Sequence, residues 1–182
     1  MRPLLHLAVA VAAIMAGSLL YECTARGQGG PPLAVAVSRL QPRLRDEAAR
    51  DWAEAIHRAA RPHGLDPVLI AALVMRESSY DPDVAEGRRL GSRGEVGVLQ
   101  VMPGGAALRF APTRCRQTEA WCSLATGCGY LAYQRDHGCP GSTWRWVAAY
   151  GRSRCPSEAE AREDVATIRA RRLYLKAGGR GW

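Results

Sequence analysis

The polar and apolar positions along the chain predict helices and almost no strands. Over residues 46–60 the apolar side chains recur three or four positions apart, which is the spacing of one face of an α-helix. Asp66 and Pro67 then supply an N-cap and a first-turn proline for a second helix. Residues 68–75 are apolar nearly all round, as in a buried helix, and this pattern ends at Glu77.

The second half of the chain continues in the same way. Helical spacing covers residues 119–136, 143–150 and 157–174, and the last of these segments opens with the capping-box residues Ser157 and Glu160. No internal repeat is present, and strand patterns are poor throughout. The fold class predicted from these patterns is mainly α.

Glu77 is the first candidate for a catalytic residue. A carboxylate at the end of an apolar helix loses hydration, which disfavours its charged form. A neutral acid is what cleavage of a glycosidic bond requires. The alternative is that Glu77 faces solvent and pairs with Arg76 or another neighbour.

Residues 86–97 are rich in glycine and charge and are predicted to form an exposed loop. The apolar residues 98–103 that follow lead back towards the core, so this loop can line a cleft.

The N-terminal residues predict an export signal. An apolar run from residue 4 to residue 20 follows Arg2, and small residues near its end suit a signal peptidase. Residues 1–25 are therefore predicted to be a signal peptide or, because the run approaches the length of a membrane-spanning helix, an uncleaved N-terminal anchor. The residue before Cys23 is not small, which argues against a lipoprotein signal. We expect an exported protein of the periplasm or cell envelope, with no other membrane attachment.

The remaining chain predicts one compact domain. Residues 26–43 contain Gly-Gly-Pro-Pro and Gln-Pro without clear periodicity and are predicted to be a linker. Residues 44–176 have the usual length of a single domain, and residues 177–182 form a tail.

The net charge of the chain favours anionic binding partners but does not identify one. Of the 25 basic side chains, 24 are arginine, and the formal net charge is +8, which attracts anionic polymers such as cell wall, nucleic acid or lipid. The arginines are scattered, as expected for solvated faces, and no nucleic-acid-binding motif is present. We therefore expect no nucleic-acid partner.

Five cysteines lie in the C-terminal half, where export makes disulfides chemically reasonable. No Cys-x-x-Cys pair occurs, which argues against a structural zinc site. The short-loop pairings are Cys115 with Cys122 and Cys139 with Cys155, a hypothesis that leaves Cys128 as a buried free thiol. We expect no metal and no organic cofactor.

Four short motifs follow one another between residues 65 and 152. They are ESSYDP at 77–82, GVLQVMP at 97–103, GCGYL at 127–131 and AAYG at 148–151. In this order they resemble the motifs of the soluble lytic transglycosylase (SLT) catalytic domain. The resemblance implies a small, lysozyme-like helical domain, related to goose-type lysozyme, whose substrate is peptidoglycan.

The resemblance also implies roles for single residues. Glu77 corresponds to the acid that protonates the bridging oxygen of the β-1,4 bond between N-acetylmuramic acid and N-acetylglucosamine. The same carboxylate then takes a proton from the C6 hydroxyl, which closes on C1 and leaves a 1,6-anhydromuramoyl end. Ser78 would position the glycan or the acid, Gln100 would line the cleft, and the Tyr150 hydroxyl would lie near the carboxylate.

Two departures from the family pattern concern the cleft. Residues 85–91 form an extra stretch, which predicts a longer loop over the cleft, and Gly151 replaces the usual asparagine. Three tryptophans are candidates for stacking on sugars: Trp121, Trp144 and Trp146. Since the last two are separated by one residue on a helix, at most one of them can face the cleft.

Two other functions remain open. A goose-type muramidase would hydrolyse the same bond with a water molecule held by a second carboxylate. The candidates are Asp81, Asp83, Glu86 and, best placed beside the Val96-Gly97 turn, Glu95, whose alternative is a solvated loop charge. The other function is that of a peptidoglycan-binding accessory of a secretion or pilus system, although the presence of Glu77 argues against binding alone.

Overall fold

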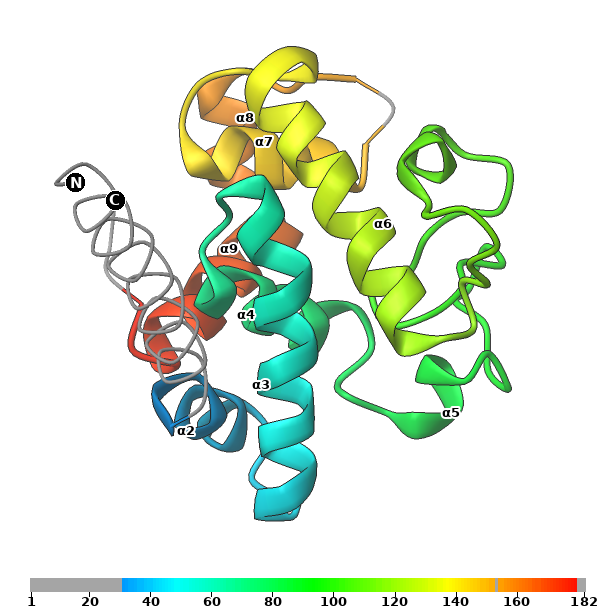
Figure 1. The fold of residues 1–182 in the computed structure, drawn as a ribbon. Coiled ribbons are helices and arrows are strands. Elements are labelled where there is room, and N and C mark those ends of the chain that lie inside the picture. The colour runs from blue at the N-terminus through cyan, green and yellow to red at the C-terminus, as the bar shows by residue number, and fades with distance from the viewer. Residues whose placement is uncertain (1–30, 153, 180–182) are drawn as a thin grey trace, which may run out of the picture.

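The structure is a computed structural model that describes residues 31–152 and 154–179. The predicted signal peptide or anchor over residues 1–25 and Cys23 lie outside these residues. The described chain is mainly helical (Figure 1), and the one β-type pairing recorded within it is the bridge between Val96 and Val101. The predicted mainly α fold is confirmed. Its elements are the α-helices α2 (Pro31–Leu40), α3 (Asp46–Ala60), α4 (Pro67–Glu77), α5 (Pro82–Ala85), α6 (Ala120–Tyr133), α7 (Thr143–Tyr150), α8 (Glu158–Glu163) and α9 (Val165–Lys176), the 3-10 turns η1 (Arg61–His63) and η2 (Ala106–Phe110), and the π-helical turn η3 (Gln134–Gly138).

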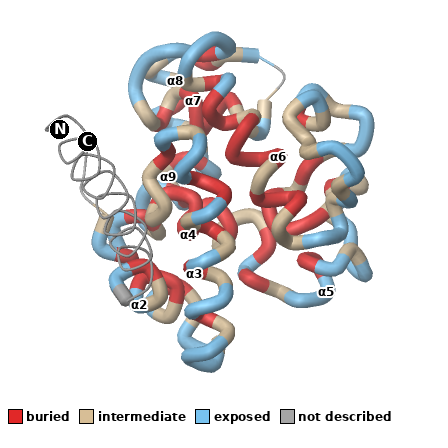
Figure 2. Tube along the Cα trace, viewed as in Figure 1, coloured by how far each residue is buried: buried red, intermediate tan, exposed pale blue. Residues whose placement is uncertain are grey.

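Helix α4 is the central element of the core. All its residues from Leu69 to Val74 are buried, and it packs against α2, α3 and α9. In Figure 2 the buried residues run through the interior along α4 and its neighbours. Burying each large aliphatic side chain contributes about 1.5–3 kcal/mol, so α4 is a rigid support for whatever its end carries.

Both ends of α4 are set by local chemistry. The Asp66 carboxylate accepts a hydrogen bond from the Val68 amide at 2.8 Å, as an N-cap does. At the other end Ser79 and Tyr80 have φ angles of 56° and 58°, which turn the chain away from the helix axis. The buried Tyr80 hydroxyl donates to the Ala71 carbonyl at 2.9 Å and ties this turn back onto the helix.

The predicted linker over residues 26–43 is wrong for residues 31–40, which form α2. Four apolar side chains of α2 are buried in the same core as α4: Leu33, Ala36, Val37 and Leu40. Their spacing of three, one and three residues is that of one helical face, and the two prolines that suggested a linker stand in the first turn, where proline is tolerated. The folded domain therefore includes α2.

The single helix predicted over residues 157–174 is two helices. The capping box of Ser157 and Glu160 is present and opens α8. Asp164 then takes an extended backbone conformation, with φ −63° and ψ 116°, and its carboxylate caps α9 by accepting from the Thr167 amide. The chain turns here because an aspartate at an N-cap stabilises a new helix start.

Two disulfides join the cysteine pairs that the short loops predicted. Cys115 is bonded to Cys122, and Cys139 is bonded to Cys155. Cys128 is a buried free thiol, and burial raises its pKa to about 12.

In the part of the chain that the structure describes, no helix has the length and apolar character needed to cross a membrane.

Candidate active site

A cleft with a volume of about 1080 Å³ opens at the C-terminal end of α4. Its wall combines segments that are far apart in sequence: the end of α4, the loop around residues 93–107, the end of α6 with η3, the segment after α7, and the beginning of α9. The residues that line the cleft include Arg76, Glu77, Arg93, Glu95, Gln100, Tyr130, Tyr133, Tyr150, Gly151, Arg152, Arg154, Cys155, Val165, Ala166 and Arg169.

Glu77, the last residue of α4, lies in the wall of this cleft. Its side chain is 18% exposed and forms an ion pair with Arg76, whose side chain is 9% exposed. Glu77 therefore pairs with Arg76, as the alternative interpretation predicted, but it lies in the cleft wall and not on an open surface. Since residues 69–74 of α4 are buried, the backbone that carries this carboxyl group is fixed from behind.

Tyr150, at the end of α7, lines the same cleft as Glu77. Its hydroxyl donates to the Leu99 carbonyl at 2.8 Å, and its ring lies 5.6 Å from that of Tyr130. Burial raises the pKa of the Tyr150 phenol well above its usual value, and the negative charge of Glu77 raises it further. The phenol therefore stays protonated and remains a hydrogen-bond donor.

Gly127 of the GCGYL motif makes this arrangement sterically feasible. A Cβ atom at this position would lie 2.4 Å from Leu99 Cδ1 and 2.9 Å from the Tyr150 hydroxyl oxygen. Only glycine leaves room for α6 and the side chains of Leu99 and Tyr150 to meet.

Gln100 lines the cleft, as predicted. Its backbone has a φ of 49°, and its side-chain amide donates to the Gly97 carbonyl at 2.9 Å. Gly97 has a φ of 74°, and a Cβ atom there would lie 2.2 Å from the Gln117 carbonyl. The tight loop that presents Gln100 therefore requires glycine at position 97.

Ser78 is predicted to position the glycan or the acid. It does not line the cleft, so its position gives it no contact with the glycan, and the role beside the acid stays a prediction. The side chain is buried, and its hydroxyl donates to the Val74 carbonyl at 3.0 Å. A serine at the last turn of a helix commonly bonds back to the carbonyl four residues earlier. Ser78 therefore closes the end of α4, directly after Glu77.

Four carboxylates were candidates for holding the water molecule of a hydrolase. Of these four, Glu95 lines the cleft together with Glu77. Its side chain is 11% exposed, and it accepts hydrogen bonds at 2.8 Å from both the backbone amide and the Nε of Arg93. Desolvation by burial favours a higher pKa for Glu95, but these bonds and the Arg93 charge hold the pKa below its usual value. The alternative of a solvated loop charge is wrong.

The other three carboxylates pair with arginines of the extra stretch. Asp81 binds Arg89, while Asp83 and Glu86 bind Arg88. None of residues 85–91 is among those that line the cleft, although Arg93 and Glu95, which follow them on the same loop, do line it. The arginines of the extra stretch hold it against α5.

The aromatic residues of the cleft are tyrosines. Trp144 and Trp146 are buried, Trp121 is covered by the Arg58 guanidinium 4.2 Å from its ring centroid, and none of the three lines the cleft. Tyr130 and Tyr133 do line it, and Tyr133 is 43% exposed. Their separation of three residues on a predicted helix was the signal in the sequence that could have identified them.

The described side chains of the cleft do not form a cluster of metal ligands. Among residues 31–152 and 154–179, no three His, Cys, Asp or Glu side chains lie close enough to hold a metal ion. Gly151, which replaces the usual asparagine, lies in the cleft wall with open space around its Cα.

The model of a known family matches this chain. The model of the family described as the transglycosylase SLT domain matches residues 54–165, which is more than half of the chain and includes Glu77, Gln100 and Tyr150. A search of curated proteins finds no match.

Proposed function

This chain belongs to the transglycosylase SLT domain family, whose members are lytic transglycosylases acting on peptidoglycan, and from that premise we propose that Glu77 carries the cleavage. The observation that supports this most directly is the position of Glu77. It ends the buried helix α4 and lies in the wall of the cleft together with Gln100 and Tyr150. The bond cleaved is the β-1,4 bond from N-acetylmuramic acid to N-acetylglucosamine.

The reaction needs one group that acts first as an acid and then as a base. Neutral Glu77 donates its proton to the bridging oxygen, and the bond from that oxygen to C1 of the muramoyl sugar breaks. The resulting carboxylate takes the proton of the C6 hydroxyl, and O6 bonds to C1. The products are a free hydroxyl on the leaving sugar and a 1,6-anhydromuramoyl end, so no water is consumed and Glu77 returns to its neutral form.

Tyr150 and Gln100 support this chemistry by position. The Tyr150 hydroxyl is anchored on the Leu99 carbonyl, and the charge of Glu77, which lines the same cleft, acts on it. Gln100 is held by Gly97 on the loop that forms another part of the wall. The exposed ring of Tyr133 offers an apolar face with a polar edge, which suits a sugar ring.

We also propose that the protein acts outside the cytoplasmic membrane. Its substrate lies there, and the two disulfides suit an oxidising compartment. The predicted export signal over residues 1–25 agrees with this location.

The test is digestion of peptidoglycan sacculi by residues 26–182, beside the variant Glu77→Gln. We expect 1,6-anhydromuramoyl ends in the mass spectrum of the products of the parent and at least about a hundredfold less from the variant, because the amide cannot exchange the proton. Equal product release by both proteins would contradict the role of Glu77. No product from either protein would favour the accessory role.

Hydrolysis is the second candidate, and the position of Glu95 favours keeping it. An ionised carboxylate in the same cleft as the acid could hold and activate a water molecule. The variant Glu95→Gln separates the two reactions. Products with reducing ends that vanish in Glu95→Gln would identify a hydrolase, whereas anhydro products that persist in this variant would exclude this role for Glu95.

A further inference from the structure

One part of the cleft wall carries a surplus of positive charge. The wall contains five arginines and two glutamates, and these glutamates pair with Arg76 and Arg93. The other three arginines are Arg152, Arg154 and Arg169, which we call the arginine wall. They come from the segment after α7 and from α9.

The acidic partners of the arginine wall do not cancel its positive charge on the cleft side. Arg152 pairs with Asp164, and Arg154 pairs with Glu160, but neither acid lines the cleft. The pair of Arg154 is largely exposed, so water weakens it. Arg169 is exposed and has no ion pair among the residues that the structure describes.

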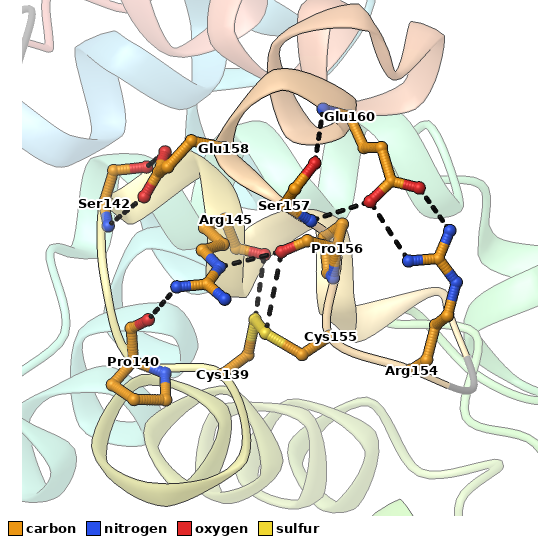
Figure 3. Close-up of a disulfide and its surroundings, with 10 residues drawn as sticks. All are labelled: Cys139, Pro140, Ser142, Arg145, Arg154, Cys155, Pro156, Ser157, Glu158 and Glu160. Carbon is orange, nitrogen blue, oxygen red and sulfur yellow. Dashed lines mark hydrogen bonds and ion pairs between the residues drawn. A yellow bond between two sulfur atoms is a disulfide. The ribbon is translucent and has the colours of Figure 1, made fainter.

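The chain next to Arg154 is held in place from behind at Cys155 and Pro156. Cys155 lies in the cleft wall and is bonded to Cys139 (Figure 3). In the same view Arg145 donates to the Pro156 carbonyl at 2.8 Å and to the Pro140 carbonyl at 2.9 Å, which binds the two sides of this disulfide together. A site fixed in this way loses little conformational entropy when a ligand binds.

An apolar surface lies next to these charges. Val165 and Ala166, in the first turn of α9, line the cleft, and Val165 is 80% exposed. Exposed aliphatic side chains beside guanidinium groups fit a ligand that combines small apolar groups with carboxylates.

The glycan alone does not have this chemistry. Its sugars are N-acetylated and neutral, and in intact strands the lactyl carboxyl group of N-acetylmuramic acid is tied up in an amide bond to the peptide. The carboxylates of peptidoglycan then belong to its peptide stems, which also carry alanine methyl groups. Guanidinium groups bind carboxylates through paired, charge-assisted hydrogen bonds.

We propose that the arginine wall, with Val165 and Ala166, is a subsite for the peptide stem, and that the protein therefore prefers glycan strands bearing peptides over denuded strands. This inference rests on the proposed function, since it takes peptidoglycan as the substrate. It adds a determinant of substrate choice outside the residues that perform the cleavage.

The test compares Arg169→Gln with Arg172→Gln in the full chain. Both residues are exposed on α9, but Arg172 does not line the cleft, so its variant is a matched control for the loss of one charge. The substrates are soluble, uncross-linked glycan strands with their peptides and the same strands after an amidase has removed them. Binding is measured by fluorescence anisotropy, and cleavage by chromatography of the products.

We expect Arg169→Gln to weaken binding of peptide-bearing strands and to raise KM by about tenfold, the size of one charge-assisted hydrogen bond. Denuded strands should change less than about twofold, and Arg172→Gln should match the parent on both substrates. An equal loss on both substrates, a larger loss on denuded strands, whose lactyl carboxylates are free, or no loss on either would each overturn the proposal. A selective loss of binding without any cleavage by the parent would instead contradict the proposed function and leave the subsite standing.

Discussion

At the scale of single residues, the hydroxyl group of Tyr150 connects three parts of the cleft. It sits on α7, bonds to the Leu99 backbone, and passes close to α6 only because residue 127 is glycine. A buried hydroxyl in such a bond contributes to stability and also sets the position of its neighbours. The two contributions can be separated, because Tyr80 makes a similar bond away from the cleft.

We therefore predict different outcomes for Tyr150→Phe and Tyr80→Phe. Each variant loses one hydrogen bond to a backbone carbonyl, so each should lower the free energy of unfolding by about 1–2 kcal/mol, measured by urea denaturation. Only Tyr150→Phe should also lower kcat, by about tenfold or more, on peptidoglycan strands. If both variants lose the same fraction of activity, the Tyr150 hydroxyl has only a structural role.

At the scale of elements, the start of α9 shows how one side chain shapes both a helix and the cleft. The Asp164 carboxylate caps α9 through the Thr167 amide and binds Arg152 of the cleft wall at 3.0 Å. Desolvation favours a higher pKa for Asp164, but these hydrogen bonds and the charge of Arg152 lower it overall. Because folding lowers this pKa, the ionised carboxylate stabilises the folded state above the pKa of the unfolded chain, about 4.

The variant Asp164→Ala should accordingly lose stability in a pH-dependent manner. At pH 7 we expect its free energy of unfolding to be about 1–2 kcal/mol below that of the parent, from the lost cap and ion pair. The difference should shrink as the pH falls below about 4, because Asp164 of the parent then becomes protonated. Urea denaturation at several pH values measures this. A difference that stays constant down to acid pH would contradict the assignment, and Asp164→Asn, which keeps a capping oxygen, should lose less than the alanine variant.

Helix α2 is the second element whose role can be tested. Leu40 is 2% exposed and belongs to the core with α4, although it lies in a segment that the sequence suggested was a linker. Leu40→Ala should lower the free energy of unfolding by about 2–5 kcal/mol. The exposed Val35 of the same helix is the control, since Val35→Ala removes no buried contact and should change stability by less than about 0.5 kcal/mol. Similar small effects of both substitutions would mean that α2 does not belong to the folded core in solution.

At the scale of the whole molecule, the two disulfides hold the C-terminal half together and differ in what they support. The bond from Cys139 to Cys155 spans 16 residues and reaches the cleft wall, whereas the bond from Cys115 to Cys122 spans 7 residues and does not. A cross-link that closes a longer loop removes more conformational entropy from the unfolded chain.

Removing each bond with a pair of serines should reveal this difference. We expect a loss of about 3 kcal/mol for the Cys139 and Cys155 pair and about 2 kcal/mol for the Cys115 and Cys122 pair, measured by denaturation without reductant. At a temperature where both variants are folded, only the first should bind peptide-bearing strands more weakly, because Cys155 adjoins the arginine wall. Weaker binding by the second variant alone would contradict this division of roles.

The sequence by itself determined the features that depend on near neighbours. The bounds of α3 and α7 follow from apolar spacing, and the starts of α4 and α8 follow from Asp66 and from the capping box of Ser157. Periodicity and capping act within one or two helical turns, so they can be read from short windows. The four ordered motifs were also sufficient to indicate the family, and Glu77 as the candidate acid.

Tertiary structure alone decided which side chains share the cleft. It buried Ser78 at the end of α4 and brought Glu95 into the wall. It also lined the cleft with Tyr130 and Tyr133 instead of the predicted tryptophans, and assembled the arginine wall from α9 and the segment after α7. It also drew α2 into the core. These outcomes depend on how segments far apart in the chain pack against one another. The helical spacing of Tyr130 and Tyr133 and of the apolar side chains of α2 is visible in the sequence, but it does not say which face meets the cleft or the core, because burial and proximity are set by the packing of the whole core.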